Sequence, residues 1–201
     1  EFWHGPYMPI YFITSAAMSG CVAIIFFTYI AYKFNGWQMS DKMKRSMESV
    51  AKMGALMMAI IIFFTSWKMI TGITGQPPGK YEAMQSLLTG DYSMNFWVGE
   101  VLLGIVLPFV IILLVKGRNM HALFIASFAG MVGIFFMRYD LVIVGQLVPA
   151  YHGMGLVDYP DLLTYVPSLH ENLVVVGGIA FCGLVFLMGE KLFRGHVSES
   201  H

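Results

Sequence analysis

Long apolar runs constrain the fold of this chain more than any other feature of its sequence. A run of about 18 or more apolar residues is long enough to cross the hydrocarbon core of a bilayer as a helix. The sequence contains about five such runs, and Pro108 interrupts the third. They cover residues 7–32, 50–73, 96–115, 120–148 and 169–193. We therefore predict an all-α, multi-pass transmembrane helical bundle that forms a single domain over residues 1–201.

Composition excludes several classes of protein. Charged residues make up 12% of the chain, whereas soluble domains carry about 25%. The 12 Lys and Arg residues are matched by 12 Asp and Glu, so no basic excess exists to bind nucleic acid. Cys21 and Cys182 lie in apolar runs and are predicted to be packing residues, without a disulfide or metal role. No histidine lies in the middle of a span and no CxxCH motif occurs, so neither haem nor an iron–sulfur cluster is expected in this chain.

The distribution of Lys and Arg among the connections predicts the orientation, because cytoplasmic loops are enriched in these residues. Segment 74–95 has only Lys80 and segment 149–168 has neither Lys nor Arg, which predicts that both lie outside. The remaining connections and the tail carry Lys33, Lys42, Lys44, Arg45, Lys116, Arg118, Lys191 and Arg194. We therefore place the N-terminus outside and the C-terminus in the cytoplasm. Each outer segment is about 20 residues long, enough for a lid or a docking surface; the alternative is a solvated connector.

Ionisable residues inside a span are costly and are candidates for function. At about 1.5 Å per residue from the cytoplasmic ends, Glu100 lies about 22 Å up the third run, Arg138 about 24 Å up the fourth and Lys68 about 27 Å up the second. Of the other candidates, Asp140 and Gln146 follow on the fourth run, and His170 and Glu171 open the fifth. The sequence therefore predicts a polar cluster at the outer mouth of the bundle, above an inner half with almost no ionisable residue.

Several candidates have both a functional and a structural interpretation. Glu100 and Arg138 are expected to pair, either within a site or as a purely structural clamp. Lys68 follows Trp67 near the outer end of its run, so its side chain either joins the cluster or snorkels to the membrane interface. Asp140 lies about 200° round a regular helix from Arg138, so only one of them faces the centre unless the helix bends.

Two candidates lie at the start of the last run, and two glycines lie on the helices that carry the charges expected to pair. Ser168-x-x-Glu171 fits a capping box, so Glu171 either caps the last helix or joins the site. His170 beside it changes its charge near neutral pH, which makes it a candidate for proton transfer. Gly104 and Gly130 share helix stripes with the two charges expected to pair, and small residues there allow close helix approach.

These residues suit two kinds of chemistry. A mouth that holds acid, base and cation groups can bind a quinone head group and exchange the protons of its redox change. It can equally admit protons or a small ion into the bundle. A third hypothesis is a membrane anchor without chemistry of its own, which the long outer segments also fit. Composition does not choose among the three.

Four segments resemble motifs of the NrfD/PsrC family of membrane subunits. Residues 99–108 (GEVLLGIVLP) resemble the family's E-x-L-L-G-x-x-L-P helix, and residues 138–146 (RYDLVIVGQ) resemble its R-Y-x-x-V-x-x-G-Q helix. Residues 165–171 (YVPSLHE) resemble the Y-x-P-S-x-x-E segment before the last helix, and residues 8–12 (MPIYF) with Ser15 fit the first. These segments occur in the expected order and are most similar to the DsrP-like and Qrc-like branch of sulfur- and sulfate-metabolism complexes.

The resemblance implies a subunit of a respiratory redox complex in the prokaryotic cytoplasmic membrane, surrounded by membrane lipid. It implies menaquinone as the redox molecule and a ferredoxin-like iron–sulfur subunit at the outer face, with a multihaem cytochrome c or other membrane subunits nearby. Family members consist of two related helical bundles, and this chain matches the C-terminal one. The family's quinone pocket is assigned to the N-terminal bundle. The polar residues here then either touch quinone or belong to a proton path or to the scaffold.

Overall fold

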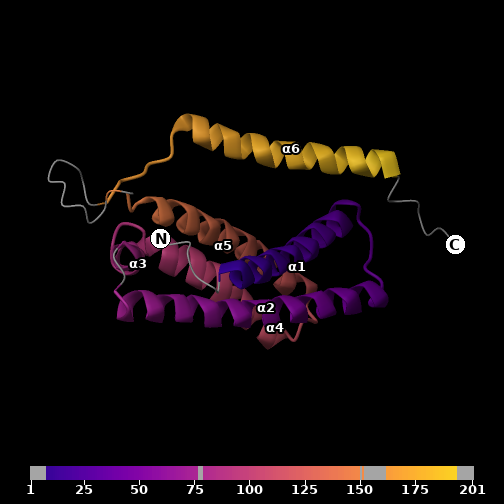
Figure 1. Ribbon diagram of the computed structural model, residues 1–201. Coiled ribbons are helices and arrows are strands. Elements are labelled where there is room, and N and C mark those ends of the chain that lie inside the picture. The colour runs from indigo at the N-terminus through magenta and orange to yellow at the C-terminus, as the bar shows by residue number, and fades with distance from the viewer. Residues whose placement is uncertain (1–7, 77–78, 150, 152–161, 194–201) are drawn as a thin grey trace. The chain divides into compact units, whose positions relative to one another are not determined.

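Helices account for every regular element in residues 8–76, 79–149, 151 and 162–193, the part of the chain that the computed structural model describes. In chain order they are α1 (Met8–Phe34), α2 (Asp41–Thr74), α3 (Lys80–Leu88), η1 (Asn95–Val106), α4 (Leu107–Val115), α5 (Met120–Gln146) and α6 (Leu169–Phe193) (Figure 1). Within these residues, 5 spans are long and apolar enough to cross a membrane: α1, α2, η1 with α4, α5, and most of α6. The predicted multi-pass helical bundle is confirmed.

The chain divides into two compact units, Glu1–Leu163 and Thr164–His201. The first unit contains all of the elements from α1 to α5, and α6 belongs to the second. Side chains of α6 that the structure describes are almost all exposed within this chain. An apolar helix of this kind is stable when lipid or other protein covers it.

Helix α5 lies at the centre of the first unit and contacts α1, α3, η1 and α4. Its closest neighbour is η1, and two glycines make that approach possible. A Cβ on Gly104 of η1 would lie 3.0 Å from the Cα atom of Gly133 on α5. On another face of α5, Gly130 meets Val22 of α1 and Met58 of α2. The predicted role of Gly104 and Gly130 in close helix approach is therefore confirmed, and Gly133 joins them.

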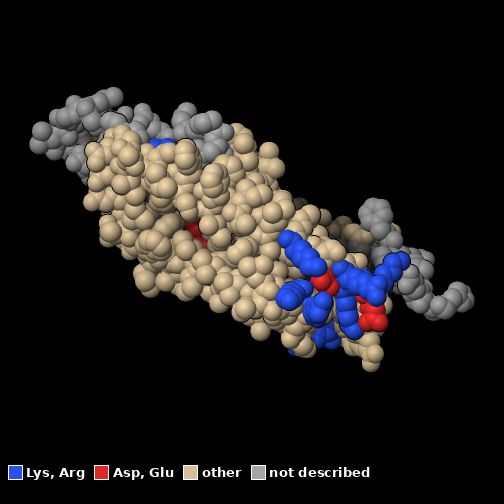
Figure 2. Space-filling view, turned by 90° about the horizontal axis from the view of Figure 1, so that it is seen from below, with Lys and Arg blue, Asp and Glu red and all other residues tan. Residues whose placement is uncertain are grey.

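Charged side chains mark one end of the first unit. Ser40 caps α2, where its hydroxyl accepts a hydrogen bond from the Met43 amide, and Asn119 caps α5 in the same way. Glu48 of α2 is within electrostatic reach of Arg45, Lys52 and Arg118, so the start of α2 and the connection before α5 meet here. Figure 2 shows Lys and Arg side chains gathered at one end of the displayed face, with few charges elsewhere on it.

The third span begins as a π-helix, which the hydrophobic pattern of the sequence does not predict. Element η1 has i→i−5 hydrogen bonds, and the last of them joins the Leu107 amide to the Leu102 carbonyl. Pro108 follows in the first turn of α4. Proline has no amide hydrogen and its ring clashes with the carbonyl four residues before it, which is Gly104 here. The wide turn ahead of Pro108 relieves that clash, so the helix continues through the proline and the span is not broken.

Part of segment 74–95 folds into the short helix α3. Its buried residues Ala83, Met84 and Leu87 face the bundle, and Met84 fills the space beside Gly72 at the end of α2. The amide of Gly79, whose φ is +78°, donates to Glu82 at 2.7 Å and begins the helix. This part of the segment is therefore held against the bundle. The other segment predicted to lie outside, 149–168, falls mostly beyond the described residues.

Candidate functional site

Four buried polar side chains meet at the end of the first unit opposite the basic connections. They come from different helices: Tyr11 from α1, Lys68 from α2, Glu100 from η1 and Asp140 from α5. None has more than 3% of its surface exposed. We call these four residues the polar cluster. The sequence predicts Glu100, Arg138 and Lys68 at a similar height; Lys68 and Glu100 belong to the polar cluster, and on α5 its member is Asp140, two residues after Arg138.

Glu100 is held in the wide turns of the π-helix. Its Oε1 atom accepts a hydrogen bond from the Tyr11 hydroxyl, with the two oxygens 3.5 Å apart. That distance is at the long end for a hydrogen bond. The Lys68 ammonium acts on the same carboxyl electrostatically. Gly99, next to Glu100, lies against Phe136 of α5, which leaves the acid enclosed by protein.

Lys68 lies inside the bundle. Its Nζ atom is 5.8 Å from the centre of the Tyr11 ring, within the range of a cation–π interaction. Only 3% of the residue is exposed, so the alternative that this side chain snorkels to the interface is wrong. The tyrosine that donates to Glu100 therefore also presents its ring face to the ammonium, and the two charges are arranged around one side chain.

Asp140 is fully buried, and neither Oδ1 nor Oδ2 has a hydrogen-bond partner among the described residues. Glu100 and Lys68 both act on it electrostatically. Burying a polar group without a partner is costly, and such groups in native proteins have an explanation in a proton, a water, an ion or a function. Asp140 is therefore the member of the cluster that has hydrogen-bonding capacity to spare.

Arg138 reaches a different neighbour from the one predicted. Its Nη2 atom donates to the Ser15 hydroxyl at 2.9 Å, and its guanidinium lies 5.1 Å from the centre of the Phe12 ring. Among the described residues the ion pairs are Lys44–Asp41 and Lys52–Glu48. The expected Glu100–Arg138 pair is therefore wrong. The reason is that α5 has protein on several faces: Arg138 points to α1 while Asp140 points into the polar cluster.

The other three predicted site residues are Gln146, His170 and Glu171. Gln146 is exposed at the last position of α5. His170 and Glu171 belong to the second unit, where both are exposed. Glu171 accepts from the Ser168 amide at 2.6 Å, and the Ser168 hydroxyl accepts from the Glu171 amide at 3.3 Å. The capping-box interpretation of Glu171 is thus confirmed.

Tyr11 and Ser15 are not among the site residues predicted from the sequence, although Tyr11 contacts Glu100 and Ser15 contacts Arg138. They lie four residues apart on the buried face of α1, next to Thr14 and Met18. Both occur in the first segment that resembles the NrfD/PsrC family. Neither residue carries a charge at neutral pH, so the sequence gives no signal that separates this tyrosine and serine from the rest of an apolar helix.

The described residues contain no group of three or more His, Cys, Asp and Glu side chains placed to hold a metal ion. The polar cluster holds groups that can take up and release protons. It contains two carboxyl groups, an ammonium and a phenol in a buried site, where electrostatic interactions are stronger than in water.

Comparison with known proteins identifies the family to which the sequence is similar. The sequence model described as "Polysulphide reductase, NrfD" matches residues 1–150. The "Hdr-like menaquinol oxidoreductase integral membrane subunit" of Archaeoglobus fulgidus is 29% identical over 204 residues, which cover 96% of this chain and 50% of that protein. A selenate reductase subunit of Mesobacillus selenatarsenatis is 27% identical over 198 residues, covering 96% and 44%. The chain spans about half the length of these curated relatives. No solved structure matches it.

Proposed function

This chain belongs to the polysulphide reductase NrfD family, and from that premise we propose that it serves a respiratory redox complex of the prokaryotic cytoplasmic membrane. In this proposal it exchanges electrons and protons between the menaquinone pool and an iron–sulfur partner at the outer face. Two relatives support the proposal by their names, one as a menaquinol oxidoreductase membrane subunit and the other as part of a selenate reductase. The five apolar helices of this chain fit a subunit embedded in a membrane.

The observation that carries the proposal is the buried Asp140 carboxyl, whose two oxygens have no hydrogen-bond partner among the described residues. Two carboxyl groups of the polar cluster share one ammonium, and keeping both ionised in a buried site is costly. One of them is therefore expected to hold a proton that it can release. A quinone, when bound, supplies a redox change that is coupled to protons. The residues present fit that need, since Asp140 and Glu100 can take up and return a proton.

The remaining members of the site position these acids. Lys68 balances the charge that appears when a carboxyl loses its proton, and Tyr11 orients Glu100 through its hydroxyl. Arg138, fixed by Ser15, adds a cation at the edge of the cluster, where it is only partly buried. In the proposed orientation this end of the bundle faces outward, next to the ferredoxin-like partner. A multihaem cytochrome c and other membrane subunits are further proposed partners.

The test is electron transfer in the intact complex, kept in its native membrane. Glu100→Gln and Asp140→Asn are each expected to slow menaquinol-linked electron transfer on the order of 10²-fold, the lower range for loss of an acid–base group. Asp41→Asn, at the opposite end with 89% of its side chain exposed, is the matched control and should leave the rate unchanged. All three variants should assemble as the wild type does.

The other hypotheses make different predictions in the same experiment. If the chain is an anchor without chemistry, the cluster variants change assembly only, and turnover per assembled complex stays at the wild-type level. If it is a path for protons or ions, quinone turnover in sealed vesicles is accompanied by a pH change that Asp140→Asn removes. Wild-type turnover in both cluster variants would overturn the proposed function.

A further inference from the structure

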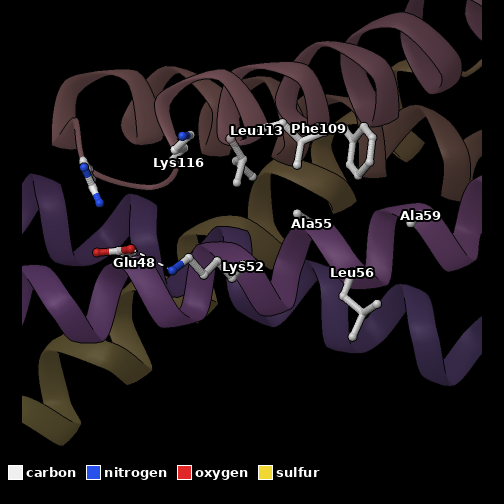
Figure 3. A pocket seen from close by; sticks show the side chains of 10 residues that line it. Glu48, Lys52, Ala55, Leu56, Ala59, Phe109, Leu113 and Lys116 are labelled. Atoms are coloured by element: carbon white, nitrogen blue, oxygen red, sulfur yellow. Dashed lines mark hydrogen bonds and ion pairs between the residues drawn. The ribbon is translucent and has the colours of Figure 1, made fainter.

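A groove lies between α2 and α4 at the basic end of the first unit, and none of the polar-cluster residues lines it. Its volume is about 490 Å³. Figure 3 shows the side chains of Phe109 and Leu113 on the side of α4 that faces α2. Charged residues gather at one end of the groove, and apolar ones continue from there toward the other end.

The charged end is built by a tight turn. Lys116 ends α4 in the left-handed conformation, with φ +53°, and Gly117 follows with φ +73°. A Cβ on Gly117 would lie 2.9 Å from Cγ of Glu48, so this turn sits directly on α2. A non-glycine residue in the left-handed region is uncommon and costs energy. The turn places Lys116 and Arg118 at the mouth of the groove, beside Lys52.

Cations outnumber acids at this mouth. Lys52, Lys116 and Arg118 line it, and Glu48 is the one acid among the lining residues. Glu48 is already engaged, because its Oε1 atom lies 2.7 Å from Lys52 Nζ. The side chain of Lys52 nevertheless remains 64% exposed. The mouth therefore has an excess of positive charge that is open to a ligand.

The rest of the groove is apolar and is kept open by small residues. Ala55 and Ala59 form its floor on α2, one helical turn apart, opposite Phe109, Ile112 and Leu113. A ligand that fits the whole groove must be anionic at one end and hydrocarbon along its length. We propose that the groove binds an anionic phospholipid, whose phosphate lies among Lys52, Lys116 and Arg118 and whose acyl chain lies over Ala55 and Ala59.

Two other occupants fit these features less well. A quinone has an uncharged head group, which does not use the excess of cations. A neighbouring apolar helix would fill the hydrocarbon part and leave the cationic mouth without a counter-charge. Basic pockets between transmembrane helices on the cytoplasmic side are typical sites for anionic head groups. The distribution of Lys and Arg predicts that this end is cytoplasmic.

The test measures lipid bound to the intact complex by native mass spectrometry after extensive detergent washing. Phosphatidylglycerol and phosphatidylcholine with identical acyl chains are added back at equal concentrations. The wild type is expected to retain phosphatidylglycerol in preference to phosphatidylcholine. Lys116→Gln together with Arg118→Gln should weaken that preference about fivefold for each cation removed. Lys44→Gln with Arg45→Gln removes two cations of the same end that do not line the groove, and should leave the preference intact.

A second variant tests the hydrocarbon part. Ala55→Leu with Ala59→Leu fills the floor of the groove and should lower retention of the lipid while the mouth keeps its charge. Equal retention of the two lipids by the wild type would overturn the proposal, as would an undiminished preference in the Lys116→Gln, Arg118→Gln variant. Co-purification of a quinone or a polypeptide in the groove, in place of lipid, would also overturn it. None of these outcomes depends on the proposed redox function.

Discussion

The Tyr11 hydroxyl donates to Glu100 across 89 positions of sequence, and the ring of the same tyrosine lies 5.8 Å from Lys68 Nζ. All three residues are buried. One side chain thus contacts the acid through its hydroxyl and the cation through its ring face. Because the two contacts use different atoms, substitutions at Tyr11 can separate the orientation of Glu100 from the burial of Lys68.

Tyr11→Phe removes the hydroxyl and keeps the ring. We expect quinone-linked electron transfer to slow about fivefold, since a long hydrogen bond contributes about 1 kcal/mol, while the melting temperature stays close to that of the wild type. Tyr11→Leu also removes the ring, so its melting temperature should fall as well. Steady-state rates and thermal unfolding in detergent measure the two effects. An unchanged rate in Tyr11→Phe would remove the orienting role of the hydroxyl.

Lys68→Met leaves two buried carboxyl groups without the nearby ammonium. Removing one partner from a buried set of opposite charges costs about 3–5 kcal/mol of stability. The melting temperature of the variant should therefore lie well below that of the wild type. Adding Asp140→Asn removes one of the two acids and should recover part of that loss, because the residues act on each other. The measurement is a double-mutant cycle on thermal stability. Strictly additive changes would show that Lys68 and Asp140 are not coupled.

Gly133→Ala places a methyl group against the backbone of Gly104, where no flexible side chain can move aside. Helices α5 and η1 must separate to admit it, at a cost of about 1–3 kcal/mol. Gly20→Ala is the matched control, because a Cβ at that helical glycine meets nothing within 4 Å. Thermal unfolding of the purified complex should show a lower melting temperature for the first variant alone. Equal melting temperatures would mean that the Gly104–Gly133 contact does not limit stability.

The helical spans could be predicted from sequence because the bilayer itself imposes their length and composition. The heights of Lys68, Glu100 and Arg138 could be predicted by counting residues, since a helix rises regularly along its axis. The direction in which each side chain points could not be predicted in the same way. It depends on how the helices are rotated about their axes, which packing decides. For this reason the sequence predicts that Arg138 pairs with Glu100, although its guanidinium donates to the Ser15 hydroxyl.

Two local features lay beyond the sequence patterns. The spacing of hydrophobic residues does not distinguish an α-helix from a π-helix. The wide turns of η1 are therefore visible only in the structure, where they precede Pro108. Helix α3 has 9 residues, fewer than an isolated helix needs for stability, and it depends on the contact of Met84 with Gly72. The burial of Lys68 could not be predicted from its own segment either, because the Tyr11 ring that it contacts comes from another helix.

Glu171 offers a test that separates capping from chemistry. Glu171→Gln keeps an oxygen that can accept from the Ser168 amide, so α6 and the rate of electron transfer should both remain as in the wild type. Glu171→Ala loses the cap and should fray the start of α6. Hydrogen exchange at residues 169–172, together with the rate, distinguishes the two variants. Slow electron transfer in a Glu171→Gln complex with an intact α6 would instead support a role for this residue in the proposed proton exchange.

The orientation predicted from Lys and Arg can be tested by thiol labelling. Cys21 and Cys182 are free, so the background for this test carries Cys21→Ala and Cys182→Ala. Lys44→Cys reports on the basic end, and Gln85→Cys reports on α3 at the opposite end, since both side chains are exposed. In intact cells a membrane-impermeant maleimide should label Gln85→Cys at once and Lys44→Cys only after permeabilisation. The reverse pattern would place the polar cluster on the cytoplasmic side. An outer iron–sulfur partner could then no longer be adjacent to it, and the proposed lipid groove would face outward.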